Sequence, residues 1–193
     1  MTNSSPTRED ALALLYEYTQ SDSLRRHALG VEQAMRKMAE KYNGNSDEWG
    51  LTGLLHDFDY EMYPTQKEHP YKGNEILKEQ GYPESICNAI MGHATYTGVP
   101  RDTDMAKALF AVDELTGFIF AVTYVRPSKS ILEVKPKSVK KKLKQRSFAA
   151  SVSRDDIFQG IDELNVDVTE HIQFVIDALK EKAEELGLKG GSQ

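Results

Sequence analysis

Histidine and aspartate side chains that could bind a metal ion or move a proton recur along the first two thirds of the sequence. Two of them, His56 and Asp57, are adjacent. Four more stand on either side of this pair: His27, His69, His93 and Asp113. Imidazole nitrogens and carboxylate oxygens together suit a divalent metal ion, which lowers the pKa of a bound water and so provides a nucleophile near neutral pH. These residue types therefore predict a bound divalent metal ion and the activated water that it can supply.

Each of these residues also has a plainer explanation. A lone inward histidine, such as His27 or His93, is more often hydrogen bonded in a core than bound to a metal. His69 stands directly before a proline and can cap a helix, and Asp113 can pair with a core histidine or a basic side chain. Their joint occurrence favours one shared site, because a buried, ionised aspartate is costly unless it has a partner.

The elements that must position these residues are helices. Apolar residues at three- and four-residue steps predict a helix from about residue 22 to the turn at 43–45, with His27 on its inner face. A second helix, over about 46–55, brings His56 and Asp57 to its end.

The later residues of the set also fall on predicted helices. Pro83 begins a helix in which His93 shares a face with apolar residues, and a largely apolar helix over about 104–125 carries Asp113. Other helices are predicted over about 8–18, 70–81, 136–150, from 153 onward, and over 167–186. Few stretches alternate with period two, so the predicted fold class is all-α, a single-domain helical bundle.

Length and composition limit the alternatives. The chain has 193 residues, enough for one compact domain, and its single cysteine excludes an internal disulfide and a four-cysteine metal site. The formal net charge of −6 argues against general nucleic-acid binding. Lys107, Asp113 and Glu114 interrupt the longest apolar run, and the polar start over 1–6 lacks a secretion signal. We therefore expect a cytoplasmic protein with no membrane span.

Three local phrases carry a resemblance to a known family: Leu54-Leu55-His56-Asp57, His69-Pro70-Tyr71-Lys72-Gly73 and Ile90-Met91-Gly92-His93. Together with the order of the histidines and aspartates, they resemble the HD-domain superfamily of metal-dependent phosphohydrolases. The resemblance covers roughly residues 21–125. It implies one HD-type helical domain over 1–193, with its core at 21–125 and a C-terminal helical extension over 126–187.

The resemblance also implies a ligand set and a reaction. Six residues would bind metal: His27, His56, Asp57, His69, His93 and Asp113. If one ion is bound, His69 and His93 are not needed, and if two are bound, Asp57 would bridge them. His56 and Asp57 would be the catalytic pair, and a metal-bound hydroxide would attack a phosphomonoester or phosphodiester of a nucleotide or small phosphorylated metabolite. The ion would be Mn, Fe, Ni, Co, Zn or Mg.

The sequence departs from the family at one point. Many members continue His-Asp-Ile-Gly-Lys, whereas this chain has His56-Asp57-Phe58-Asp59-Tyr60. The lysine of that motif is absent, so the substrate contacts of those members are not carried over. Our candidates for substrate contacts are instead Tyr60 and Arg101, from loops near the predicted ligands, with Arg126 and Lys129, which follow the Asp113 helix.

The segment from Arg126 to Arg146 contains nine basic residues and a single acid, Glu133. In an acidic protein this concentration could form an electropositive wall that attracts a phosphorylated substrate. The alternative is that the lysines only solvate the outer face of a helix anchored by Val139 and Leu143.

Two other functions remain open from the sequence. The same six-ligand arrangement occurs in di-iron oxygenases of the superfamily, which cleave C–C or C–P bonds. A non-catalytic HD domain that binds a ligand is the other alternative. The expected partner is a small phosphorylated substrate, and assembly into a homo-oligomer is left open.

Overall fold

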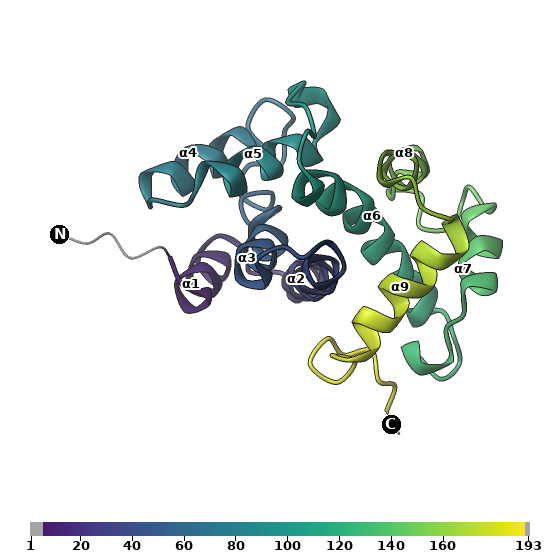
Figure 1. The fold of residues 1–193 in the computed structure, drawn as a ribbon. Helices are drawn as coiled ribbons and strands as arrows, with labels where there is room; N and C mark the ends of the chain where they lie inside the picture. Colours follow the sequence, from purple (N-terminus) through teal and green to yellow (C-terminus); the bar gives the residue numbers. More distant parts are fainter. Residues whose placement is uncertain (1–5, 192–193) are drawn as a thin grey trace. The chain divides into compact units, whose positions relative to one another are not determined.

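The structure, a computed structural model, describes residues 6–191. These residues form nine α-helices and no β-strand, with one isolated bridge between Ser130 and Lys189 (Figure 1). The predicted all-α fold class is therefore confirmed. Residues 1–5 of the polar start, on which the absence of a secretion signal was predicted, lie outside the described residues. No helix within residues 6–191 combines the length and apolar character that crossing a bilayer requires.

The chain divides into two compact units between Leu109 and Phe110, a boundary that falls inside α6 (Asp104–Tyr124). Each unit is described by itself below. The assignment of a single domain over 1–193 stays a prediction.

The first unit contains five helices and the start of α6. They are α1 (Arg8–Tyr18), α2 (Asp22–Tyr42), α3 (Ser46–Leu55), α4 (Tyr71–Glu79) and α5 (Glu84–His93). Side-chain caps mark the starts of two of them, α1 and α3. Thr7 and Asp10 form a reciprocal capping box before α1, and the side chain of Asn45 accepts two backbone N–H bonds at the start of α3.

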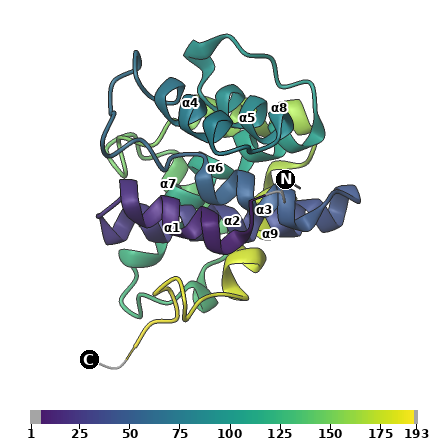
Figure 2. The same cartoon turned by 90° about the vertical axis from the view of Figure 1, so that its left-hand side faces the viewer.

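Close packing of α2 against α3 brings the first two histidines together. The two helices lie side by side in Figure 2, as do α4 and α5. Gly53 of α3 makes the approach possible, because a Cβ atom there would stand 2.8 Å from the carbonyl oxygen of Val31. Met35, Leu54 and Leu55 are fully buried in the core of this unit.

The second unit contains most of α6 and three further helices. They are α7 (Pro136–Leu143), α8 (Arg154–Leu164) and α9 (Val168–Lys180). Gly160 of α8 packs against the backbone of α6, where an added Cβ would stand 2.6 Å from Cα of Ala111. His171, on α9, is buried, with Nε2 2.9 Å from the carbonyl oxygen of Ala111.

Two predicted helix ends are wrong. The prediction carried α7 to Ala150, but the helix ends at Leu143 and turns follow. Ala149 has φ of 42°, a left-handed conformation that cannot continue a helix, and the guanidinium of Arg154 bonds the Ala149 carbonyl at 2.6 Å. These turns are therefore stabilised by a side chain from the next helix.

The last helix is also shorter than the predicted 167–186. It ends at Lys180, and the amides of residues 182 and 183 form tighter bonds to carbonyls three residues back. The chain then turns so that Leu186 and Leu188 are buried and the carbonyl of Leu188 accepts the N–H of Ile131 at 2.8 Å. Pairing with this distant segment ends the helix.

Candidate metal centre

Four elements of the first unit bring histidines to one place. His27 lies on α2, His56 directly follows α3, His69 lies in the loop before α4, and His93 is the last residue of α5. Asp57 lies among them. These five predicted ligands, far apart in the sequence, therefore come together in the structure.

A first group consists of His27, His56 and Asp57. The Nε2 atoms of His27 and His56 are 3.2 Å apart, and Oδ2 of Asp57 is 3.3 Å from Nε2 of His56. The ligand atoms of the group all lie within 4.8 Å of one another. Ligand atoms at about 2.1 Å from a common metal are about 3 to 3.5 Å apart, so the spacing fits a metal ion.

A second group consists of Asp57, His69 and His93. Oδ1 of Asp57 lies 3.2 Å from Nε2 of His93 and 3.3 Å from Nε2 of His69, and the two Nε2 atoms are 3.3 Å apart. Asp57 thus turns one carboxylate oxygen to each group. This is the arrangement that a bridging carboxylate requires.

The other ring nitrogens show why a cation suits these groups. Nδ1 of His56 donates to the carbonyl oxygen of Gly53 at 2.8 Å, and Nδ1 of His93 donates to that of Ile90. Because a carbonyl oxygen can only accept, each of these rings carries a hydrogen on Nδ1, and in its neutral form it presents a lone pair from Nε2. Lone pairs that face one another repel unless a proton or a metal cation lies between them.

Electrostatics within the cluster follow the same logic. Burial opposes protonation of His69, but its contacts with the carboxylates of Asp57 and Asp59 prevail and raise the pKa of His69 to about 9. Burial alone would raise the pKa of Asp57, yet the neighbouring His56, together with His69 and His93, holds this pKa well below its usual range. The cluster thus keeps a negative carboxylate and attracts positive charge.

Asp59 is a site residue that the sequence analysis noted only as a departure from the family motif. It is 1% exposed, and its Oδ1 accepts the Nδ1–H of His69 at 2.8 Å. Its Oδ2 accepts the backbone N–H of Gly73, also at 2.8 Å. The hydroxyl of Tyr96 donates to the carbonyl oxygen of His69, at 2.8 Å, and so holds the same residue from its backbone. The usable signal for Asp59 was an aspartate within an apolar turn, which needs donors when buried.

Two of the predicted substrate contacts lie beside this cluster. The ring of Tyr60 meets the ring of His69 edge to face, with centroids 5.3 Å apart, and is 42% exposed. Arg101 donates from Nη1 to the carbonyl oxygen of Gly92 at 2.7 Å, directly before His93. Their contact with a substrate stays a prediction.

The other predicted site residues belong to the second unit. Asp113 lies on α6, and its role as a metal ligand stays a prediction. Arg126 pairs with Glu133 at 3.3 Å, and Lys129 has φ of 48° in the turn after α6. Their roles as substrate contacts also stay predictions.

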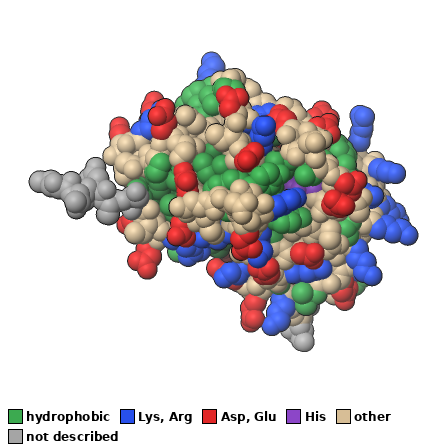
Figure 3. Space-filling view, in the orientation of Figure 1, with side chains coloured by type: hydrophobic (Ala, Val, Ile, Leu, Met, Phe, Trp, Pro, Cys, Tyr) green, Lys and Arg blue, Asp and Glu red, His purple; other side chains and the backbone are tan. Residues whose placement is uncertain are grey.

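The basic segment has a polar and an apolar side. Val139 of α7 is fully buried, while blue side chains line the edge that α7 occupies (Figure 3). Four exposed lysines rim a hollow of about 620 Å³ with Leu143, Phe158 and Val168: Lys137, Lys140, Lys141 and Lys144. Both readings of this segment, a wall for anions and a solvated outer face, remain predictions.

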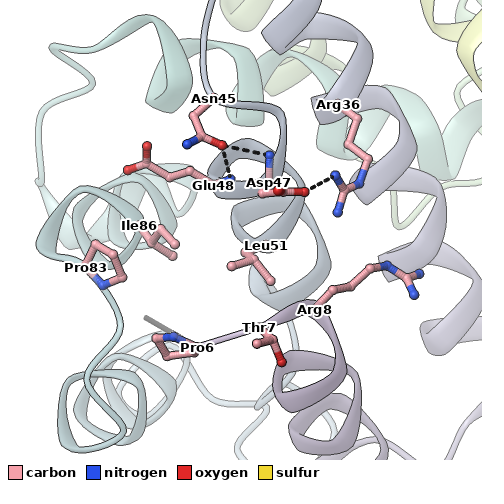
Figure 4. A pocket seen from close by; sticks show the side chains of 10 residues that line it. All are labelled: Pro6, Thr7, Arg8, Arg36, Asn45, Asp47, Glu48, Leu51, Pro83 and Ile86. Carbon is pink, nitrogen blue, oxygen red and sulfur yellow. Dashed lines mark hydrogen bonds and ion pairs between the residues drawn. The ribbon is translucent and has the colours of Figure 1, made fainter. Parts of the chain in front are cut away.

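A separate hollow of about 580 Å³ lies in the first unit and is lined by none of the clustered histidines (Figure 4). Its apolar wall includes Leu51, Pro83 and Ile86. Among its charged groups, Arg36 is paired with Asp47 at 3.0 Å. The chemistry-bearing side chains of this unit therefore lie elsewhere, in the histidine cluster.

Comparison with known families agrees with this geometry. Residues 24–117 match the family model of the HD domain. This match confirms the resemblance of these residues to the HD-domain superfamily, whose members are mostly metal-dependent hydrolases. Searches of curated proteins and of solved structures returned no match.

Proposed function

We propose that this protein is a metal-dependent phosphohydrolase that cleaves a phosphomonoester or phosphodiester of a nucleotide or small phosphorylated metabolite. The observation that carries the proposal is that four histidines, from four elements of an HD domain, gather around the carboxylate of Asp57. His27, His56 and Asp57 would hold a first ion together with Asp113. Asp57, His69 and His93 would hold a second.

The ions, when bound, supply an activated water and positive charge for the phosphoryl oxygens. The chain supplies orientation. The hydrogen bonds from Nδ1 of His56 and His93 to carbonyl oxygens fix both rings with Nε2 directed inward. Asp57, whose side chain is 24% exposed, is the part of the cluster that a substrate can approach. Its two oxygens lie between the groups and fix their separation.

Candidate ions are Mn, Fe, Ni, Co, Zn and Mg, because all accept nitrogen and oxygen ligands. We keep the cytoplasmic location as part of this proposal. The first experiment is to incubate the purified chain with each metal and a panel of nucleotides, sugar phosphates and cyclic nucleotides. Release of phosphate or nucleoside is expected, and His56→Ala and Asp57→Ala should each abolish it. Inactivity of the unaltered chain with every metal and substrate would reject the proposal.

A di-iron oxygenase is the second candidate, and the separate group formed by Asp57, His69 and His93 is the observation that favours it. An oxygenase needs both groups filled with iron and consumes oxygen. Oxygen uptake by the iron-loaded chain, measured with the same substrates, distinguishes the two. Phosphate release with Mn or Co and without oxygen uptake would favour the hydrolase.

A further inference from the structure

We propose that Asp59 is a positioning residue for the second metal ion, and that Gly73 is glycine because it must leave room for the Asp59 carboxylate. The inference rests on the proposed function, since it concerns a ligand of the metal centre described there. It assigns a role to the residue at which this chain departs from the His-Asp-Ile-Gly-Lys pattern of many family members.

His69 differs from the other histidines of the cluster in what holds its ring. His56 and His93 each donate from Nδ1 to a carbonyl oxygen three residues earlier, within their own local turn. His69 has no such partner, and Nδ1 donates instead to Oδ1 of Asp59, ten residues away along the chain. A carboxylate partner fixes the tautomer with the lone pair on Nε2 and makes that nitrogen a more basic ligand than a carbonyl partner does.

Asp59 is in turn fixed by the start of α4. Its second oxygen accepts the N–H of Gly73 at 2.8 Å, and the side chain is 1% exposed. An added Cβ on Gly73 would stand 2.7 Å from Cγ of Asp59, a distance that side chains do not tolerate. The two residues therefore fit only as a pair. Asp59 links the first turn of α4 to the ring that faces Asp57.

The geometry also shows which substitution is informative. Asp59 accepts one N–H on each of its two oxygens. Asparagine has the same size but only one acceptor oxygen, and its NH₂ group would face a donor. Asp59→Asn therefore loses one of the two bonds without creating a cavity. Gly73→Ala displaces the same carboxylate without substituting Asp59 or any predicted ligand.

Glu61 provides a matched control on the same loop. Its Oε2 accepts the backbone N–H groups of Gln20 at 2.6 Å and of Ser21 at 3.1 Å, and within residues 6–191 it makes no hydrogen bond to a histidine. Because both donors reach one oxygen, glutamine can keep both bonds. Glu61→Gln thus makes the same change of charge at an exposed position without touching the histidine cluster.

The test is a calorimetric titration of the chelator-stripped chain with Co²⁺ alone, followed by the visible spectrum of the Co²⁺ complex. The unaltered chain and Glu61→Gln should each bind two Co²⁺ ions. The affinity for each ion should be the same in the two proteins. Asp59→Asn and Gly73→Ala should bind one of the two about 10 to 100-fold more weakly, with a changed spectrum of the second ion.

Equal affinities for both ions in Asp59→Asn and Gly73→Ala, in chains shown to be folded by circular dichroism, would overturn the inference. So would binding of only one Co²⁺ by the unaltered chain. Phosphoester hydrolysis is measured separately on the same samples. If the variants lose the second ion selectively but the unaltered chain hydrolyses no phosphoester, this inference stands and the proposed function is rejected. If the unaltered chain hydrolyses a phosphoester but the variants bind both ions with unchanged affinities, the proposed function stands and this inference is rejected.

Discussion

Nε2 of His27, on α2, lies 3.2 Å from Nε2 of His56, at the end of α3, although 29 residues separate them in the chain. The approach depends on Gly53, which lets α3 pack directly against the backbone of α2. The same glycine accepts the Nδ1–H of His56 on its carbonyl oxygen. The packing of α2 on α3 and the candidate metal centre therefore both depend on this residue.

Replacing Gly53 by alanine should disturb both. The new Cβ would stand 2.8 Å from the Val31 carbonyl oxygen, so the helices must separate. We expect a loss of about 1 to 3 kcal/mol in the free energy of unfolding, measured by urea denaturation, and weaker binding of the first metal ion. Gly191→Ala, where an added Cβ meets nothing within 4 Å, is the control. Equal stability of Gly53→Ala and the unaltered chain would show that the contact is relaxed without cost.

Phe58 anchors the turn between the two aspartates. It is fully buried, its ring packs edge to face on Tyr18 with centroids 5.3 Å apart, and its carbonyl accepts the Thr19 hydroxyl at 2.9 Å. Phe58→Ala should lower the free energy of unfolding by about 3 to 5 kcal/mol, because a large core side chain leaves a cavity. Tyr60→Ala, two residues on and exposed, should change it by less than about 0.5 kcal/mol. Similar losses for the two variants would contradict the assigned anchoring role.

Tyr60 should affect substrate binding and leave stability unchanged. Its ring lies against that of His69 and is 42% exposed, so a substrate that reaches the second metal ion would touch it. Tyr60→Ala is expected to raise KM about 10-fold with little change in kcat, because the ring makes contact without taking part in the reaction. Tyr60→Phe should behave as the unaltered chain. Steady-state kinetics on the best substrate of the panel provide the test, and an unchanged KM in Tyr60→Ala would remove Tyr60 from the substrate contacts.

Glu32 should matter for stability alone. It is 4% exposed and accepts bonds from Arg8 at 2.7 Å and from Arg36 at 3.0 Å, which ties α1 to α2. The arginines are partly exposed and can be solvated when the carboxylate is removed, so Glu32→Gln should cost about 1 to 3 kcal/mol, less than the loss of a fully buried pair. Metal affinity should stay as in the unaltered chain. The exposed pair of Lys72 and Glu75 is the control, and Lys72→Ala should cost less than about 0.5 kcal/mol.

Local signals accounted for much of the fold and part of the site. Apolar periodicity placed His27 on the inner face of its helix, and the polar residue Asn45 marked the start of α3, as the structure has them. Both features depend on neighbours a few residues away, which a sequence displays directly. The order of the histidines along the chain predicted that they lie close together, because one shared site explains all of them.

What the sequence did not predict depends on contacts between distant segments. The bond from His69 to Asp59 and the fit of Asp59 against Gly73 require the loop and the start of α4 to be placed first. The end of α7 depends on the guanidinium of Arg154, which bonds turn carbonyls that would otherwise favour a longer helix. Neither helix propensity nor apolar periodicity shows which distant residues will contact one another.

The most direct test is elemental analysis of the chain purified without added metal and again after dialysis against Mn²⁺. We expect up to two divalent metal ions per chain, and their loss from the double variant His56→Ala/Asp57→Ala. The Glu61→Gln variant should keep them. An unaltered chain that holds no divalent metal ion under either condition, or a double variant that holds as many as the unaltered chain, would contradict the claim that these histidines and Asp57 form a metal centre.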